Sequence, residues 1–164
     1  MTPAVLEAIN GQIANEFGAS FSYLAMAAWC EHHNFLGAGQ WLRVQSAEEH
    51  AHGLKLFNFV LARNHHARLG TIAQPAWDFT SVGEVFERAL AQEQEVSRQI
   101  DALYELAFRE KVFAAMAELQ WFITEQVEEE KNASEIVAQL EMVEAHETAV
   151  LMLDHRLGKR GGED

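Results

Sequence analysis

One long segment, residues 67–79, divides this chain because it contains Pro75 and shows no helical period. On both sides of it, apolar residues recur every three or four positions, which predicts long helices. These lie at about 3–33 and 40–66 before the segment, and at about 82–108 and 112–142 after it. A helix of about 27 residues is roughly 40 Å long, and about 14 extended residues reach roughly 46 Å. The segment can therefore run the whole length of a bundle, which predicts that the two helices it joins are parallel.

The other two connections are short, at residues 34–39 and 109–111, and predict antiparallel neighbours. A chain of 164 residues is long enough to bury one proper core. Two prolines and 49% hydrophobic residues favour helices over strands. The expected fold is a single all-α domain, a four-helix bundle with one long crossover.

A short fifth helix is expected at about 146–157. No glycine or proline separates it from the helix before it, so the sequence also allows one continuous helix. Its apolar face is expected to be buried by neighbouring subunits, because a single four-helix bundle has no room for it. The last residues, 158–164, are expected to form a solvated end.

Glu49 and His52 place a carboxylate and an imidazole on the inward face of the second predicted helix. They are three residues apart, so they lie on one face, one turn above the other. They also share the phase of Leu42 and Leu56, which belong to the apolar stripe. An unpaired buried charge costs several kcal/mol or neutralises. A metal ion is the simplest occupant that offsets this cost.

The same feature recurs on the other three long helices. Each carries polar residues near its middle, in phase with its apolar stripe: Glu16, Glu93, Gln126 and Glu129. A single inward polar residue is usually hydrogen-bonded to a neighbour, but six of them in phase on four helices indicate a shared ligand set. Carboxylates with one imidazole suit iron or manganese, and zinc can compete. Four carboxylates can neutralise two divalent ions, which predicts a dinuclear site.

Further candidates adjoin this set. Tyr23 lies two turns from Glu16 on the inner stripe, where it is either a core aromatic residue or a partner of the site. A second acidic group shares Glu129 and otherwise consists of Glu48, Glu125 and Glu128. It is interpreted either as an adjoining cation site or as a solvated charge run. Glu130 is interpreted as solvated.

The charge balance bears on the class of partner. With 25 acidic and 12 basic residues, the net charge of −13 disfavours nucleic acid and attracts cations. Cys30 stands alone, so neither a disulfide framework nor a thiolate metal site is expected. The start of the chain lacks the layout of a secretion signal, and no apolar run approaches the roughly 18 residues of a membrane span. A cytoplasmic protein with no membrane partner is expected.

Two stretches resemble the signatures of the non-haem bacterial ferritins. They are residues 47–53, Ala-Glu-Glu-His-Ala-His-Gly, and residues 119–130, Leu-Gln-Trp-Phe-Ile-Thr-Glu-Gln-Val-Glu-Glu-Glu. The resemblance extends over nearly the whole chain, including Asn15-Glu16, Tyr23, Glu93 and Leu153-Asp154. It implies a ferritin-like four-helix bundle with a short fifth helix. It also implies a hollow shell of twenty-four subunits.

The resemblance further implies roles for the individual residues. The first ferroxidase iron would be held by Glu16, Glu49 and His52, with Glu49 bridging, and the second by Glu93, Gln126 and Glu129. A third iron position matches Glu48, Glu125, Glu128 and Glu129. The aromatic residues beside the centre match Tyr23 and Trp121, and the expected catalytic residues are Tyr23, Glu49 and His52. Fe(II) would be oxidised by O2 or H2O2 and stored as a ferric oxyhydroxide mineral, without haem.

Two alternatives remain. A di-iron oxidase or peroxidase without mineral storage would use similar ligands, but such proteins, like bacterioferritins, usually repeat Glu-x-x-His where this chain reads Gln126-Val127-Glu128-Glu129. Position 50 is also His50 rather than a haem-binding methionine. A metal-free helical scaffold would have to hold the inward carboxylates together by protonation alone, since their pKa values would rise.

Overall fold

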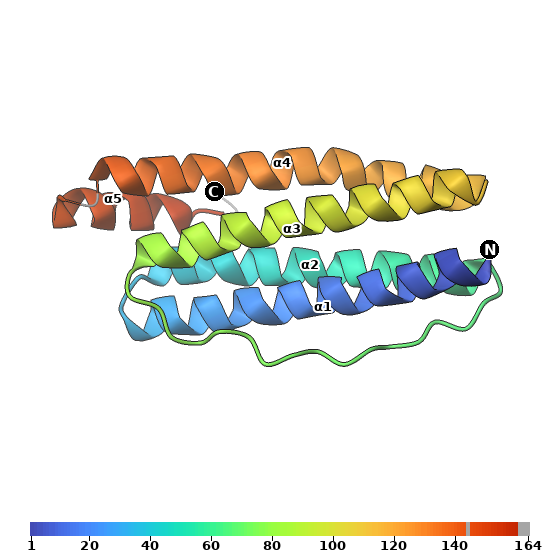
Figure 1. The fold of residues 1–164 in the computed structure, drawn as a ribbon. Helices are drawn as coiled ribbons and strands as arrows, with labels where there is room; N and C mark the ends of the chain where they lie inside the picture. The colour runs from blue at the N-terminus through green and yellow to red at the C-terminus, as the bar shows by residue number, and fades with distance from the viewer. Residues whose placement is uncertain (144, 161–164) are drawn as a thin grey trace.

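The computed structural model describes residues 1–143 and 145–160. Within those ranges the chain is helical and contains no strand (Figure 1), which confirms the all-α prediction. The helices are α1 Pro3–His32, α2 Leu36–Ala62, α3 Val82–Arg109, α4 Phe113–Val143 and α5 Glu147–Leu157. None of these described helices combines the length and the apolarity needed to cross a bilayer.

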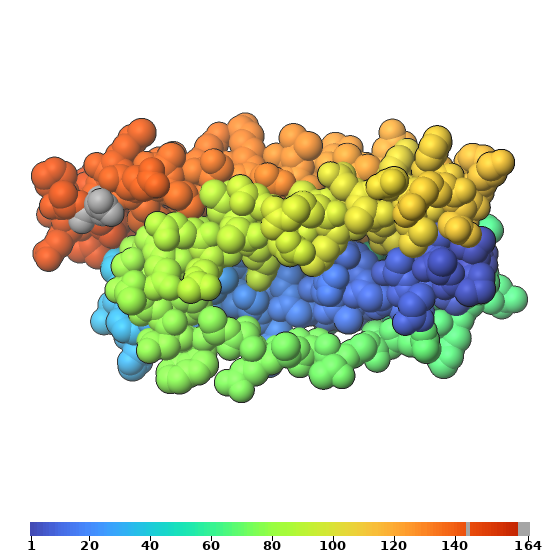
Figure 2. Space-filling view, viewed as in Figure 1, coloured from blue at the N-terminus to red at the C-terminus, as the bar shows by residue number. Residues whose placement is uncertain are grey.

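The crossover between α2 and α3 runs along the outside of the bundle from one end to the other (Figure 1). As predicted, α2 and α3 are parallel, whereas α1 with α2 and α3 with α4 are antiparallel. The crossover lies on the surface beside α1 (Figure 2), where Asn10 Oδ1 accepts a hydrogen bond from Arg68 N at 2.9 Å. Ala67 and Phe79, near its two ends, are buried and anchor it.

Asparagine residues end the first two helices. Asn34 and Asn64 have positive φ values of 65° and 56°, a backbone region that asparagine tolerates better than most residues. Helix α2 accordingly ends at Ala62, before the predicted 66. It also begins at Leu36 rather than at the predicted 40. Gly37 and Gly39, which the sequence placed in the short connection 34–39, lie inside α2 because they allow close packing against other parts of the chain.

Side-chain caps form at the starts of α1 and α3. Thr2 Oγ1 accepts a hydrogen bond from Val5 N at 3.4 Å at the start of α1. At the start of α3, Ser81 Oγ accepts from Glu84 N at 3.1 Å. The Glu84 carboxylate reaches back to accept from Thr80 N at 2.8 Å, one residue before the cap. These contacts satisfy N–H groups that have no partner within the helix.

Helix α5 is separate from α4 and packs within the same chain, which corrects the expectation that neighbouring subunits alone would bury its apolar face. Leu153 and Leu157 are buried beside α2. The Asp154 carboxylate accepts hydrogen bonds from Gly37 N at 3.1 Å and Ala38 N at 2.7 Å. The first turn of α2 has free N–H groups, and Gly37 has no side chain, so α5 can dock there.

The core has two apolar clusters, one toward each end of the bundle. One contains Tyr23, Trp41 and Phe86, and the other contains Ile9 and Leu56. Buried polar side chains lie between the clusters, near the middle of α1 to α4. The bundle therefore encloses a polar layer with apolar packing on both sides.

Candidate metal centre

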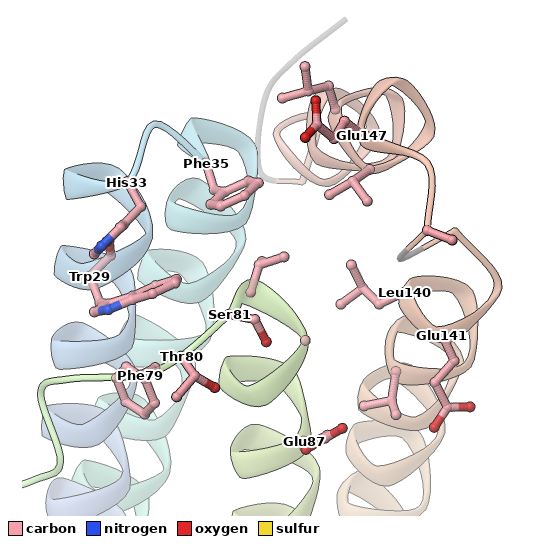
Figure 3. Close-up of a pocket in the computed structure, with 16 residues that line it drawn as sticks. Trp29, His33, Phe35, Phe79, Thr80, Ser81, Glu87, Leu140, Glu141 and Glu147 are labelled. Atoms are coloured by element: carbon pink, nitrogen blue, oxygen red, sulfur yellow. The ribbon is translucent and has the colours of Figure 1, made fainter.

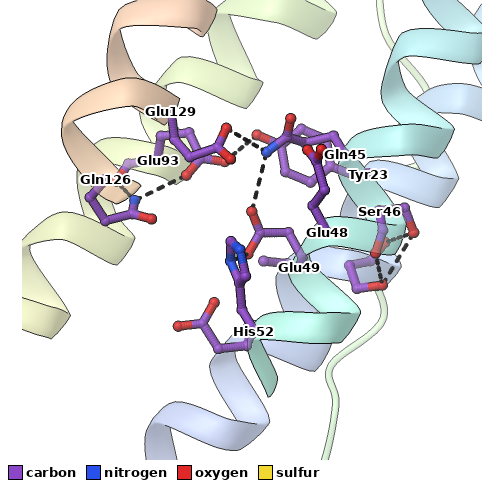
Figure 4. A network of polar contacts seen from close by, with 12 residues as sticks. Tyr23, Gln45, Ser46, Glu48, Glu49, His52, Glu93, Gln126 and Glu129 are labelled. Carbon is purple, nitrogen blue, oxygen red and sulfur yellow. Dashed lines mark hydrogen bonds and ion pairs between the residues drawn. The ribbon is translucent and has the colours of Figure 1, made fainter. Parts of the chain in front are cut away.

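The polar layer consists of the six side chains that the sequence predicts to point inward. All of them are at most 5% exposed: Glu16, Glu49, His52, Glu93, Gln126 and Glu129. Figure 4 shows most of them facing one another across the middle of the bundle. Their helical phase brings them inside because each lies on the same face as the apolar residues that pack the core.

Glu16, Glu49 and His52 form the tightest group. One possible ligand atom from each lies within 4.8 Å of the others. Three buried atoms here have no hydrogen-bond partner among the described residues: Glu16 Oε2, Glu49 Oε2 and His52 Nδ1. His52 Nδ1 is 3.3 Å from Glu49 Oε2, but the two do not form a hydrogen bond. Buried polar atoms without partners are costly, so these three fit a shared metal ion.

The other half of the layer is held by hydrogen bonds. Gln126 Nε2 donates to Glu93 Oε2 at 3.1 Å, and the Tyr23 hydroxyl donates to Glu93 Oε1. Gln45 Nε2 donates to Glu129 Oε2 at 2.7 Å and to Glu49 Oε1 at 3.3 Å (Figure 4). Each of these donors orients a carboxylate oxygen toward the interior of the layer. Glu49 lies between the two halves, because one of its oxygens faces Gln45 and the other faces His52.

Burial makes all four carboxyl groups weaker acids than usual. It raises the pKa of Glu16 to about 8 and the pKa of Glu129 to about 7, and the charge of Glu49 adds to the effect on Glu16. Burial likewise raises the pKa of Glu49 and of Glu93. The pKa of Tyr23 is raised well above its ordinary value by burial and by Glu93, so its hydroxyl stays a donor. A bound cation would favour the ionised carboxylates and replace these protons.

The metal-free protein is expected to be more stable at pH 5 than at pH 8. Because the folded-state pKa values of Glu16 and Glu129, about 8 and about 7, exceed the ordinary 4.5, the folded protein holds protons that the unfolded chain has released. This stabilisation is full below pH 4.5 and is lost as the pH rises through 7 and 8. Urea unfolding of the metal-free protein, prepared with a chelator, should show that the free energy of unfolding falls by about a few kcal/mol between pH 5 and pH 8. Zn(II) added at pH 8 should reverse it, and a flat pH profile would contradict the assignment.

The third site stays a prediction. Glu48, Glu125 and Glu128 join no group of three close ligand atoms in the part of the chain that is described. Glu48 contacts Arg160 instead, and Glu128 is exposed. The interpretation of Glu130 as solvated is wrong, because it is half-buried and accepts a hydrogen bond from Ser97 Oγ.

Two glutamines were not predicted as part of the site. Gln12 Nε2 donates to Glu16 Oε1 at 2.9 Å, and Gln45 donates to Glu49 and Glu129. Both precede a buried glutamate by four residues, so the pairs lie on one helix face. That spacing is the sequence signal that would have found them.

Aromatic side chains close one side of the layer. The ring of Trp121 lies 5.2 Å from that of His52, edge to face, and Phe122 lies 5.9 Å from the same ring. Lys55 Nζ lies 4.7 Å from the centre of the Trp121 ring. Trp121 is thus beside the site, where the sequence predicted an aromatic residue.

A cavity of about 900 Å³ lies elsewhere, where α1, α3, α4 and α5 meet (Figure 3). Trp29, Phe79, Leu140 and Val150 are among the residues that line it. None of its lining residues belongs to the polar layer. The cavity is therefore separate from the polar layer.

The fold and the site together define a helical-bundle protein with an internal group of carboxylates and a histidine that could hold a metal ion. A family model described as a ferritin-like domain matches residues 6–143. The bacterial non-heme ferritin of Staphylococcus aureus (strain USA300) is 36% identical over 156 residues, which cover 95% of this chain and 94% of that protein. The chain belongs to the ferritin family.

Other relatives agree with this assignment. The bacterial non-heme ferritin of Staphylococcus haemolyticus (strain JCSC1435) is 39% identical over 128 residues, covering 78% of this chain and 77% of that protein. An engineered closed form of the Archaeoglobus fulgidus ferritin superposes with a TM-score of 0.97 at 35% identity, covering 99% of both chains. The open-pore ferritin of the same archaeon gives a TM-score of 0.96 at 36% identity, covering 98% of this chain and 99% of that one.

Proposed function

We propose that this protein stores and detoxifies iron by oxidising Fe(II) to Fe(III) and holding the product as a ferric oxyhydroxide mineral. The observation that carries the proposal is that Glu16, Glu49 and His52 lie close enough to share one metal ion, and that each has a buried polar atom with no hydrogen-bond partner among the described residues. Family membership gives the reaction class. Fe(II) is the substrate, and O2 or H2O2 is the oxidant.

The residues divide the work between two iron positions. Glu16, Glu49 and His52 would bind the first Fe(II), and Glu93, Gln126 and Glu129 would bind the second. Glu49 would bridge the two, which its position between the two groups supports. Each Fe(II) gives up one electron, so a pair supplies the two electrons that reduce O2 to H2O2 or H2O2 to water. Tyr23 acts by positioning Glu93 through its hydroxyl.

The wider proposal includes assembly and location. A shell of twenty-four copies is supported by the nearly complete superposition on archaeal ferritins. Exposed apolar side chains, including Leu151 and Met152 on α5, are available for contacts between copies. A third iron position at Glu48, Glu125, Glu128 and Glu129 remains part of the proposal on the resemblance alone. The single, buried Cys30 is consistent with a reducing cytoplasm.

An aerobic Fe(II) titration followed by size-exclusion chromatography tests this function. Iron and protein are measured in the same fractions. Co-elution of iron far beyond two or three ions per chain with a very large assembly is the expected result. Uptake that stops at about two ions per chain on a small oligomer would contradict storage. That second result would favour a di-iron oxidase or peroxidase.

The substitution Gln126→Glu is expected to retain iron longer at the centre. The neutral Gln126 amide donates to Glu93, and a carboxylate there would add a negative ligand to the second position. We expect release of the oxidised iron to slow by about tenfold, measured as the recovery of the initial rate after a second Fe(II) addition. Gln120→Glu, on an exposed position of α4, adds the same charge away from the centre. Unchanged turnover and release in Gln126→Glu would count against this role.

A further inference from the structure

Arg160 lies just after α5, in the end of the chain that the sequence predicted to be solvated. Its guanidinium group is instead packed on the bundle. Its Cζ lies 4.3 Å from the centre of the Trp41 ring. Its Nη1 donates to Gln45 Oε1 at 2.7 Å, and its Nη2 donates to Glu48 Oε2. The side chain is only 23% exposed. This group is therefore held at a defined place rather than extended into water.

The contact with Gln45 connects Arg160 to the metal centre. Because the guanidinium only donates hydrogen bonds, the oxygen of the Gln45 amide must face it. The nitrogen of the same amide then faces Glu129 and Glu49, to which it donates at 2.7 and 3.3 Å. Arg160 thus determines which end of the Gln45 amide points at the carboxylates.

The contact with Glu48 places a positive charge beside the acidic group. Glu48 is one of the residues that the proposed third iron position requires. Within the described part of the chain, Arg160 is the cation that forms an ion pair with Glu48. Its charge also acts on Glu129, which the second and third proposed iron positions share. A metal ion that approaches Glu48 would therefore be repelled by the Arg160 guanidinium.

We propose that Arg160 is a tethered cation that occupies the place of a third metal ion beside Glu48 and fixes the orientation of the Gln45 amide. This inference rests on the proposed iron-binding function. An ion reaches Glu48 only when the guanidinium swings away from it. Arginine stays protonated at all ordinary pH values, so competition by metal ions, and not a change of pH, moves it.

Calorimetric titration of the metal-free protein with Co(II) tests the proposal by counting ions. The intact chain is expected to bind two ions tightly and a third weakly. Arg160→Ala removes the competing charge, so the affinity for the third ion should rise by about fivefold or more. This factor corresponds to the energy of a modest ion pair. Arg160→Lys keeps the charge but lacks the planar fork, so an intermediate affinity is expected. The matched control is Arg156→Ala on α5, because Arg156 contacts Gln139 instead.

A double variant shows whether the gained ion sits at Glu48. Adding Glu48→Gln to Arg160→Ala should abolish the gain while leaving the two tight ions. A third-ion affinity that is equal in the intact chain and Arg160→Ala, or a gain that survives in the double variant, would overturn the proposal. If two ions still bind tightly, the proposed function stands without it. If the intact chain binds no ion tightly, the proposed function fails, and this inference fails with it.

Tryptophan fluorescence reports the displacement directly. Because the guanidinium lies on the Trp41 ring, its departure should change the emission in a step after the first two Zn(II) ions have bound. That step should be missing in Trp41→Phe and in Arg160→Ala. Binding of a third Zn(II) without such a step in the intact chain would show that Arg160 stays in place, which is contrary to the proposal.

Discussion

The substitution Glu49→Gln is expected to slow Fe(II) oxidation by about 100-fold or more. Mutation of a residue that only supports a metal ligand typically lowers affinity or activity by about 10- to 100-fold, and loss of a ligand should cost at least as much. Glu49 lies between the two halves of the polar layer, and one of its oxygens has no hydrogen-bond partner in the described part of the chain. The amide replaces a negative ligand by a neutral one and removes the proposed bridge. Stopped-flow absorbance of Fe(III) formation measures the rate.

The same variant is expected to make the metal-free protein more stable at pH 8. Burial and neighbouring carboxylates raise the pKa of Glu49, so its ionised form destabilises the folded chain. A neutral amide of the same shape removes that effect. The midpoint of thermal unfolding should therefore rise by a few degrees, which corresponds to a gain of about 1 kcal/mol in the free energy of unfolding. Glu141→Gln, on the same bundle but away from the polar layer, is the control. An oxidation rate within a fewfold of the original would refute the bridging role.

The second large effect is expected from Gly37→Ala, which should destabilise the protein by about 2–4 kcal/mol and release α5. A Cβ atom at Gly37 would lie 1.7 Å from the backbone oxygen of Asp154 and 2.6 Å from its carbon. Backbone atoms cannot turn aside as a side chain can, so α5 has to move. The hydrogen bonds from Gly37 and Ala38 to Asp154 would then be lost. Urea unfolding gives the stability, and hydrogen exchange of residues 147–157 shows the release.

Gly11→Ala is the matched control. Gly11 is also a helical glycine, but a Cβ atom there would meet nothing within 4 Å. Alanine should therefore stabilise α1 by about 0.5–1 kcal/mol, the usual difference in helix propensity. If Gly37→Ala were also neutral or stabilising, the close approach of α5 to α2 would be wrong.

The bundle and its polar layer follow from periodicity. Apolar residues at helical spacing predicted the four long helices, and the length of the crossover predicted that α2 and α3 are parallel. The six inward polar residues were found because they share the phase of apolar neighbours. The role of each as an iron ligand remains a proposal. Three of these side chains lie close together, and the other three are held by hydrogen bonds.

Contacts between distant segments were not predictable in the same way. The sequence places Gly37 and Gly39 in a connection between helices, whereas both lie inside α2, where their small size allows packing against α5 and Glu31. Nothing in the local sequence shows that Arg160 stacks on Trp41, because the partner is more than a hundred residues away. Asn34, which follows the end of α1, has a positive φ angle, and composition does not reveal this backbone conformation.

The outer path of the crossover divides the molecule into two helical hairpins, α1 with α2 and α3 with α4. Each hairpin is built from contacts that are local in sequence, so each can form quickly, before the long loop closes. Glu16, Glu49 and His52 belong to the first hairpin, and Glu93, Gln126 and Glu129 to the second. The proposed dinuclear centre would therefore be completed only at the last step of folding, when the two hairpins meet. Metal ions present during synthesis would bind across that junction and favour the docked state over the separated hairpins.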